Sequence, residues 1–402
     1  MKNFAKNSSK SIRILLAHNR YLISGGERQV FEAEHDLLLA NGHEVETYIE
    51  DNERVAELGN TRTAVRTIWS KETYQRFRKK LSQGSFDIVH VHNFFPLMSP
   101  SIYYAAQAQQ VPIVQTLHNF RLLCLNGFLF RDGDVCEDCV GRPVPWPGIY
   151  NGCYKDSLGG SATVAAMLSF HRAIKTWDRM INTYIALTEF SRQKLIDGGL
   201  PGNKIATKPN FVTRNPGQGS GQGDFALFVG RLSPEKGIDT MLAAWETMEE
   251  AIPLKIVGDG PLSEKVASAA ASLPGVDYLG RQNNDQVLSF MQDAAFLLFP
   301  SLWYENFPMT IVEAFATGLP VLASNLGNTA SLIQPRQTGL HFTPGDAADL
   351  AEKARWLMQH PDARKEMRST VRRTYEQHYT PSQNYNQLIT IYKNTLAAVN
   401  DG

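Results

Sequence analysis

Short apolar runs alternate with segments of helical periodicity along this chain, and the alternation occurs twice. The runs are IRILLA, EVETYI, DIVHVH, PIVQTLH and TYIALT in the first half, and ALFVG, LKIVGDG, VDYLG, AFLLFPS and PVLAS in the second. Strands that alternate with helices favour parallel sheets built from βαβ units. We therefore predict an α/β protein with two doubly wound, Rossmann-like domains. Ligands of such sheets bind beyond the carboxyl ends of the strands, which places a site in an interdomain cleft.

The length of 402 residues suits two domains of ordinary size. The segment TRNPGQGSGQG, residues 213–223, is rich in Gly, Pro, Ser and Gln and is typical of a linker or long surface loop. We expect a first domain over 1–212, a second over 224–380 and a final helix over 381–402. Three helices are predicted near the C-terminus, at about 346–359, 361–378 and 381–400.

Charge and hydropathy limit the partners and the location. Forty basic and forty acidic residues leave no formal net charge, so there is no electrostatic footprint for nucleic acid. The polar N-terminus precedes only a short apolar run, and no stretch approaches the ~20 apolar residues that cross a bilayer. We expect a cytoplasmic protein and allow for peripheral membrane contact. For the segment 161–181, with Arg172, a core-facing helix with a basic edge is favoured over a membrane-binding one.

Glu305 and Glu313 lie eight residues apart in SLWYENFPMTIVEAFATGLPVLAS. The buried strand AFLLFPS leads into a loop that carries Glu305, and Pro308 is well placed to open a helix with Glu313 about one turn inside it. Carboxylates accept hydrogen bonds from sugar and ribose hydroxyls, and a helix N-terminus favours phosphate. The segment therefore indicates a nucleotide-sugar site, although a solvated helix face is the ordinary alternative.

Arg231 and Lys236 follow the first strand of the second half, in VGRLSPEKGID. Two cations within ~4 Å of a leaving diphosphate would each contribute up to ~4 kcal/mol at an effective dielectric constant of ~20. They could replace a divalent metal, and no DxD-like pair stands near a strand end apart from the glycine-flanked Asp259. We favour this role over two solvated surface charges and expect catalysis without a metal or another cofactor.

Polar residues also end strands of the first half. Gly25 and Gly26 join the first strand to a helix that begins near Glu27, where glycines let backbone amides approach an anion. An ordinary turn is the alternative, and the absence of GxGxxG disfavours a dinucleotide site. His118 ends the strand PIVQTLH and is expected to face the cleft. His90 and His92 alternate on DIVHVH and suit paired metal ligands, but with no third ligand visible a structural or acceptor-side role is favoured.

All cysteines of the chain lie in an expected insertion at about 119–160: they are Cys124, Cys136, Cys139 and Cys153. Cys136 and Cys139 form a C-x2-C pair with one cysteine on either side. Without a secretory signal, disulfides are disfavoured, and a structural zinc site with four thiolates is the natural interpretation. Free thiols or a redox pair are the alternatives that the spacing leaves open.

The R-x4-K and E-x7-E spacings together resemble the family-4 (group 1) retaining glycosyltransferases, which have the GT-B fold. The resemblance implies that Arg231 and Lys236 stabilise the leaving diphosphate and that Glu305 orients the sugar. It further implies that Glu313 holds the ribose, that His118 touches the sugar, that the last helix crosses back to the first domain, and that Gly25, Gly26, Asn306 and Phe307 contact the donor.

Two departures from the family pattern stand out. The family commonly has E-G-F-G-L where this chain has Glu305 to Met309, and Pro308 cannot donate the amide hydrogen of the replaced glycine. Where the family usually has Gly-Gly and then a Glu, this chain has Asn328 and Ser331, to which no function is carried over.

The activity implied by the resemblance is hexosyl transfer with retention, from a nucleotide-diphospho-sugar to a hydroxyl of a carbohydrate or lipid-linked acceptor, in polysaccharide or lipid-linked glycan synthesis. Other interpretations are a nucleotide-sugar epimerase, a phosphorylase, or a non-catalytic nucleotide-sugar-binding partner subunit. An epimerase needs acids placed for proton exchange, and a phosphorylase usually carries a pyridoxal phosphate held by a lysine. We locate neither feature in the sequence. The sequence alone does not identify the nucleotide base, the transferred sugar or the acceptor.

Overall fold

The computed structural model describes residues 11–22, 26–248 and 250–400. They form two parallel sheets, each of six strands. The first sheet has the order β2-β1-β3-β4-β7-β8 and the second the order β11-β10-β9-β12-β13-β14. The first contains β1 (Arg13–Arg20), β2 (Glu44–Asp51), β3 (Ile88–Asn93), β4 (Ile113–Thr116), β7 (Thr183–Ala186) and β8 (Ile205–Thr207). The second contains β9 (Ala226–Val229), β10 (Leu254–Val257), β11 (Val276–Gly280), β12 (Phe296–Phe299), β13 (Val321–Ser324) and β14 (Gly339–Phe342).

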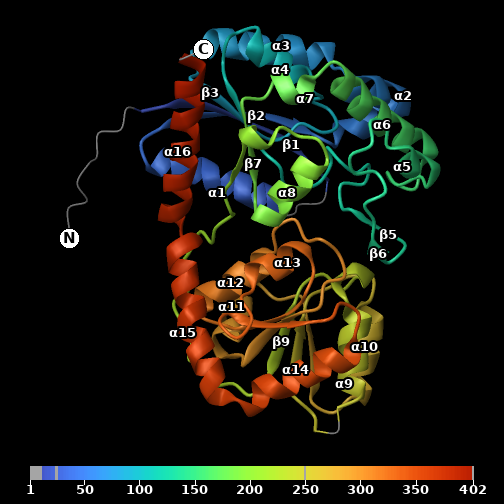
Figure 1. Ribbon diagram of the computed structural model, residues 1–402, viewed down its shortest axis with the longest axis vertical. Coiled ribbons are helices and arrows are strands. Elements are labelled where there is room, and N and C mark those ends of the chain that lie inside the picture. The colour runs from blue at the N-terminus through green and yellow to red at the C-terminus, as the bar shows by residue number, and fades with distance from the viewer. Residues whose placement is uncertain (1–10, 23–25, 249, 401–402) are drawn as a thin grey trace.

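Helices flank both sheets, as Figure 1 shows. Those of the first half are α1 (Gly26–Ala40), α2 (Arg54–Ile68), α3 (Lys71–Gly84), α4 (Ser101–Gln107), α5 (Trp146–Tyr150), α6 (Leu158–Ala173), α7 (Thr176–Arg179) and α8 (Glu189–Asp197). Those of the second half are α9 (Ile238–Glu246), α10 (Ser263–Ser272), α11 (Asn284–Asp293), α12 (Met309–Thr317), α13 (Gly327–Leu332), α14 (Ala347–Gln359), α15 (Pro361–His378) and α16 (Pro381–Asn400). The predicted fold class is confirmed.

Strand order fixes where a ligand can bind. In the second sheet the order reverses between β9 and β12, and in the first it reverses between β1 and β3. The chain leaves neighbouring strands in opposite directions at such a point, so a crevice opens at their carboxyl ends. The segments that follow β1, β9 and β12 meet around one cavity, because all three contribute residues to its lining.

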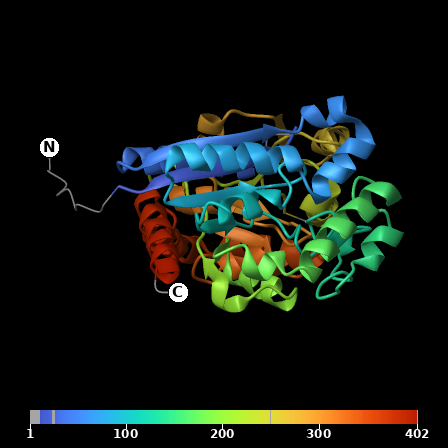
Figure 2. The same cartoon turned by 90° about the horizontal axis from the view of Figure 1, so that it is seen from above.

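The last helix joins the two halves on one side of the molecule (Figures 1 and 2). Leu388, Ile389 and Tyr392 of α16 lie in one buried cluster with Ile14 and Leu16 of β1. Tyr392 also bonds through its hydroxyl to Nδ1 of His90, at 2.7 Å. The structure thus places α16 against the first sheet, while α15 packs on α12 of the second half.

The segment 213–223 contains no helix or strand, but it is held on the second half by its backbone. The amides of Gly219, Gly221 and Gly223 donate to carbonyls of Thr317, Gln292 and Asp293. Its glycines allow this close backbone approach, which a composition-based prediction of a linker does not reveal.

The cysteine-bearing segment carries a short hairpin, β5 (Phe130–Arg131) and β6 (Asp134–Val135), followed by α5. It lies on the side opposite α16, and the hairpin points toward the second half (Figure 1). Among the helices of the described residues, none is long and apolar enough to cross a membrane.

Candidate active site

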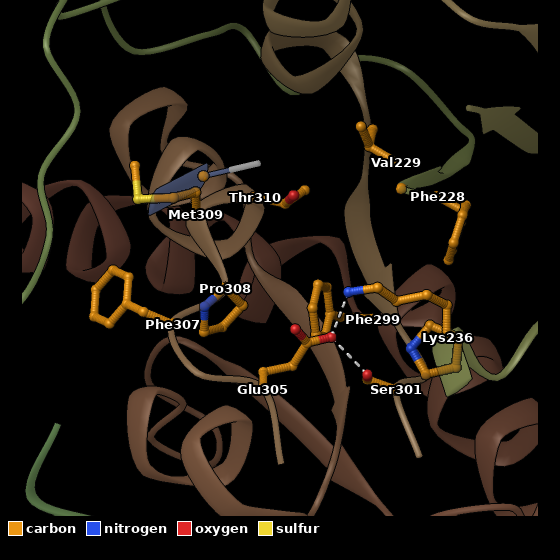
Figure 3. Close-up of a pocket in the computed structure, with 13 residues that line it drawn as sticks. Phe228, Val229, Lys236, Phe299, Ser301, Glu305, Phe307, Pro308, Met309 and Thr310 are labelled. Atoms are coloured by element: carbon orange, nitrogen blue, oxygen red, sulfur yellow. Dashed lines mark hydrogen bonds and ion pairs between the residues drawn. The ribbon is translucent and has the colours of Figure 1, made fainter. Parts of the chain in front are cut away.

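Lys236 and Glu305 meet in the crevice between β9 and β12 (Figure 3). Lys236 ends a short 3-10 turn, Pro234–Lys236, after β9, and Glu305 lies in the loop after β12. Their Nζ and Oε1 atoms are 2.6 Å apart. The two side chains that the sequence assigned to diphosphate and sugar therefore form an ion pair with each other.

Gly237 allows the two loops to approach this closely. Its φ of +70° lies in the left-handed region, and a Cβ there would stand 1.9 Å from the carbonyl oxygen of Pro300. Any other residue would clash with the backbone and strain it. The glycine after Lys236 thus fixes the position of the lysine relative to the end of β12.

The carboxylate of Glu305 is held by one of its two oxygens. Oε1 accepts hydrogen bonds from Lys236 Nζ at 2.6 Å, Ser301 Oγ at 2.7 Å and Trp303 Nε1 at 3.0 Å. No hydrogen bond from the described residues reaches Oε2. A carboxylate oriented in this way can accept hydrogen bonds from a ligand hydroxyl at its second oxygen.

The N-terminus of α12 opens on the same cavity. Pro308 is its N-cap residue and offers no side-chain cap, and Met309 and Thr310 line a cavity of about 220 Å³ (Figure 3). The first amides of a helix have no helical partner and carry partial positive charge. Together with Lys236, they form a site suited to an anion such as a diphosphate.

Gly26, at the start of α1, also lines this cavity, together with Gly230 and Phe299 of the second half. The cavity therefore lies between the two halves. Gly25, the other glycine of the predicted anion-binding turn, lies outside the described residues.

Arg231 and Glu313 are absent from the lining of this cavity. Arg231 is exposed and does not line the cavity, although it follows the same strand as Lys236. Glu313 lies on α12, partly buried, and burial raises the pKa of its carboxyl group. Neither residue has a hydrogen bond to another described side chain. Of the two predicted cations, Lys236 thus lines the cavity and pairs with Glu305, whereas Arg231 does not line it.

Asn306 and Phe307 have different environments. Phe307 lines the cavity, but it is buried and belongs to a hydrophobic cluster of the second half. Asn306 does not line the cavity, and no described residue forms a hydrogen bond with its buried Oδ1.

His118 lies at the end of the first sheet, buried, with Nε2 3.0 Å from Nδ1 of His92. Burial lowers the pKa of His118 to about 3. The imidazole is therefore neutral near pH 7, and in this structure it does not line the cavity.

The structure adds a third candidate metal ligand to the two strand histidines, which the sequence did not show. It is Glu34 of α1. Its carboxylate lies within 4.8 Å of ligand atoms of His90 and His92, and all three residues are buried. Lys208 Nζ lies 2.6 Å from Glu34 Oε1 and is also fully buried. The ammonium group already supplies the positive charge that a metal ion would bring, so we interpret the cluster as an ion-pair network behind His118.

Glu27 is a second acid missed by sequence reasoning, although it directly follows the Gly-Gly pair. Burial raises its pKa to about 8. Its buried Oε1 lies 3.6 Å from Nδ1 of His18, and neither atom has a hydrogen-bond partner among the described residues. The carboxyl group stands at the N-terminus of α1, one residue from the cavity.

The four cysteines are free thiols. Burial, and to a smaller extent the neighbouring thiols, raise the pKa of Cys139 to about 11. Burial is also the main cause that raises the pKa of Cys136, with smaller contributions from Asp138 and Cys124. Burial and then Cys124 raise the pKa of Cys153. The four side chains thus face one region. Within the described residues, however, no three of their sulfurs lie within 4.8 Å of one another.

Comparisons with known proteins identify relatives of this chain. An uncharacterized glycosyltransferase of Methanocaldococcus jannaschii is 32% identical over 165 residues, 40% of this chain and 46% of its own length. The matched parts span less than half of the first two curated relatives. The 2-deoxystreptamine N-acetyl-D-glucosaminyltransferase of Niallia circulans is 22% identical over 332 residues, covering 80% of this chain and 79% of its own.

Among solved structures, Anabaena HepE in complex with UDP superposes with a TM-score of 0.67 at 16% identity, covering 95% of this chain and all of its own. This likeness shows the fold. The family models "Glycosyltransferase Family 4" and "Glycosyl transferases group 1" match residues 23–215 and 214–374. The chain therefore belongs to the group 1 glycosyltransferases of the GT-B fold.

Proposed function

We propose that this protein transfers a hexosyl group, with retention of anomeric configuration, from a nucleotide-diphospho-sugar to a hydroxyl group of a carbohydrate or lipid-linked acceptor. The observation that carries the proposal is the Lys236–Glu305 pair beside the uncapped N-terminus of α12, in a cavity between the two halves. Cationic groups for a diphosphate and an oriented acceptor for sugar hydroxyls lie next to each other there.

In the proposed reaction the bond between the anomeric carbon and the diphosphate oxygen breaks, and the acceptor oxygen bonds to that carbon. The proton of the acceptor hydroxyl passes to the leaving diphosphate. Lys236 and the first amides of α12 stabilise the negative charge that grows on this group, and Glu305 Oε2 accepts from a sugar hydroxyl. Lys236 must shift part of its interaction from Glu305 to the phosphate as the donor enters.

The remaining predicted residues contact other parts of the donor in this scheme. Glu313, one turn along α12, would accept from the ribose, and His118 would contact the sugar from the first half. Arg231 would have to swing in from solvent to reach the diphosphate. Because Lys236 and α12 supply positive charge, we expect transfer without an added divalent metal.

Donor release in the absence of acceptor tests the proposal. The purified protein is incubated with labelled UDP-, GDP- and ADP-sugars, starting with UDP because HepE was solved with it. We expect slow release of free sugar from one donor class, with unchanged rate when magnesium is omitted. No release from any donor favours a binding subunit, and conversion to an epimeric donor favours an epimerase. The anomer formed with an acceptor, determined by NMR, tests retention.

We also propose that the four cysteines hold a structural zinc ion. Their thiols face one region and no disulfide joins them. Zinc would draw the sulfurs closer together and lower their pKa values, as thiolate coordination does. Metal analysis of protein purified without chelator should give about one zinc per chain. Less than half an equivalent, with thiols that titrate freely in the native state, contradicts the assignment.

A lipid-linked acceptor would bring the protein to a membrane surface, and cell-surface polysaccharide or lipid-linked glycan synthesis is the proposed setting. Arg172 of α6 is not available for lipid contact, because its guanidinium donates to backbone carbonyls of Pro143 and Leu122, each at 3.3 Å. Flotation with anionic liposomes at low salt measures such contact, and absence of binding under those conditions rules it out.

A further inference from the structure

Asn328 stands where the family pattern has its second glycine, and its side chain is fully buried. The residue belongs to α13 in the second half. Its Nδ2 donates to the backbone carbonyl of Glu305 and, at 3.1 Å, to that of Asn306. Both carbonyls can only accept, so the amide nitrogen must face them.

The amide oxygen of Asn328 points the other way, to the first half. It accepts from Thr188 Oγ1 and, at 3.0 Å, from Ser191 Oγ. Thr188 is the N-cap of α8 and also accepts from the amide of Ser191 at 3.0 Å. One buried side chain therefore makes four hydrogen bonds, two to each half, and uses its full bonding capacity.

Further contacts join α8 to the same loop. The ring of Tyr304, which precedes Glu305, meets Phe190 edge to face at 4.8 Å, and Lys194 Nζ lies 5.9 Å from its centre. Gly327 makes room for this ring, since a Cβ there would stand 2.4 Å from it. Leu187, just before α8, is buried in a hydrophobic cluster of the second half.

The geometry points to Asn328 as a positioning residue that connects the Glu305 loop to α8, so that the loop takes its catalytic arrangement only when the two halves are closed. This rests on the proposed function. When the halves separate, the two hydroxyl groups leave Asn328, and the loop loses the contacts that fix its backbone. Closure of the two halves is thereby coupled to the placement of Glu305, although neither Asn328 nor α8 contacts the sugar.

The substitution Asn328→Asp separates the two sides of this connection. Aspartate still accepts from Thr188 and Ser191, but its second oxygen faces two carbonyls and has no hydrogen to donate. Ser191→Ala removes one donor from the first half and leaves the cap of α8 in place. Ser331→Ala is the matched control, because Ser331 lies on α13 and donates only to the carbonyl of Asn328, at 2.9 Å.

The test measures three properties of each variant. They are the steady-state rate of donor hydrolysis, the affinity for UDP, GDP or ADP by calorimetry, and the thermal unfolding temperature. For Asn328→Asp we expect kcat to fall about 10- to 100-fold. Nucleotide affinity should change less than about threefold, and the Ser331→Ala control should keep its kcat. Ser191→Ala should show a smaller fall in kcat, and Asn328→Asp combined with Ser191→Ala should be no worse than Asn328→Asp alone.

Unchanged kcat in Asn328→Asp overturns the inference, and so does a loss of nucleotide affinity equal to the loss of kcat. If the wild type hydrolyses no nucleotide sugar, the proposed function fails, but small-angle X-ray scattering still tests the connection. The ligand-free Ser191→Ala protein, which loses a hydrogen bond between the halves, should then show a larger radius of gyration than wild type and Ser331→Ala, and equal radii overturn the coupling.

Discussion

The two sheets end at the same crevice, but they treat their polar side chains in opposite ways. At the first sheet, His90, His92, His118, Glu34 and Lys208 are buried and contact one another. At the second, Glu305 Oε2 accepts no hydrogen bond from the described residues, and the N-terminus of α12, which has no side-chain cap, opens on a cavity. In the proposed function, the first half therefore provides a buried wall of the crevice and the second half binds the charged part of the donor.

The strongest challenge to this comparison is to break the buried ion pair of the first half. Burial alone would raise the pKa of Glu34, but Lys208 lowers it below its ordinary value. Lys208→Met leaves that carboxylate buried without a cation, so we expect the free energy of unfolding to fall by about 3–5 kcal/mol. Urea denaturation measures the change. Lys208→Met combined with Glu34→Leu should recover much of it, and a single variant as stable as wild type contradicts the structural role.

The corresponding change in the second half should affect turnover instead of stability. We expect Lys236→Ala to lower kcat for donor hydrolysis by about 10²- to 10³-fold, as when an oxyanion donor is removed. Lys265→Ala is a suitable control, because Lys265 is exposed and pairs with the exposed Asp239. Wild-type turnover in Lys236→Ala refutes the role of Lys236.

The pH dependence of stability tests whether His118 is a buried, neutral part of the first half. The folded pKa of about 3 lies below the unfolded value of 6.5, so the buried imidazole contributes stability that is complete above pH 6.5 and is lost as pH falls toward 3. Between pH 7 and pH 5 this loss is about 2 kcal/mol. The destabilisation caused by His118→Asn should therefore be about 2 kcal/mol smaller at pH 5 than at pH 7 in urea titrations.

Comparison of the variant with wild type at each pH removes the contributions of groups that both proteins share, such as Glu27, whose raised pKa acts in the opposite direction. The exposed His378→Asn serves as the control. Equal destabilisation by His118→Asn at both pH values would show that the imidazole is charged or accessible in the folded protein.

The smallest expected effect concerns Glu313. Burial raises its folded pKa, whereas ribose hydroxyls that donate to it favour the carboxylate. Nucleoside diphosphate binding should therefore release part of a proton at a pH near the raised pKa, and less at higher pH. Calorimetry in two buffers of different ionisation enthalpy measures this release. Glu313→Gln should abolish it, and an unchanged release in that variant assigns the proton to another group.

Much of the fold could be predicted, because regular periodicity encodes it directly. The observed α14, α15 and α16 begin and end within one residue of the expected positions. Two strands, β8 and β14, were missed, because β8 has only three residues and β14, with the sequence GLHF, is not a continuous apolar run. The hairpin β5–β6 was missed for the same reason as β8.

Only part of the candidate site could be predicted from the sequence. Spacing indicated Lys236 and Glu305, but not that they pair, since that depends on Gly237 and on the neighbouring positions of β9 and β12. Glu34 could not be predicted, because its contact with His90 and His92 arises from the packing of α1 on the sheet. Asn328 was visible only as a departure from the family pattern, and its bonds to α8 exist only across the two halves.

A crystal structure with the nucleoside diphosphate that binds best among UDP, GDP and ADP tests the central claim most directly. The account predicts a terminal phosphate within hydrogen-bond distance of Lys236 Nζ and of the first amides of α12, with Glu305 Oε2 facing the space where the sugar would lie. A diphosphate bound elsewhere, with the Lys236–Glu305 pair undisturbed and the cavity at α12 empty, would contradict it.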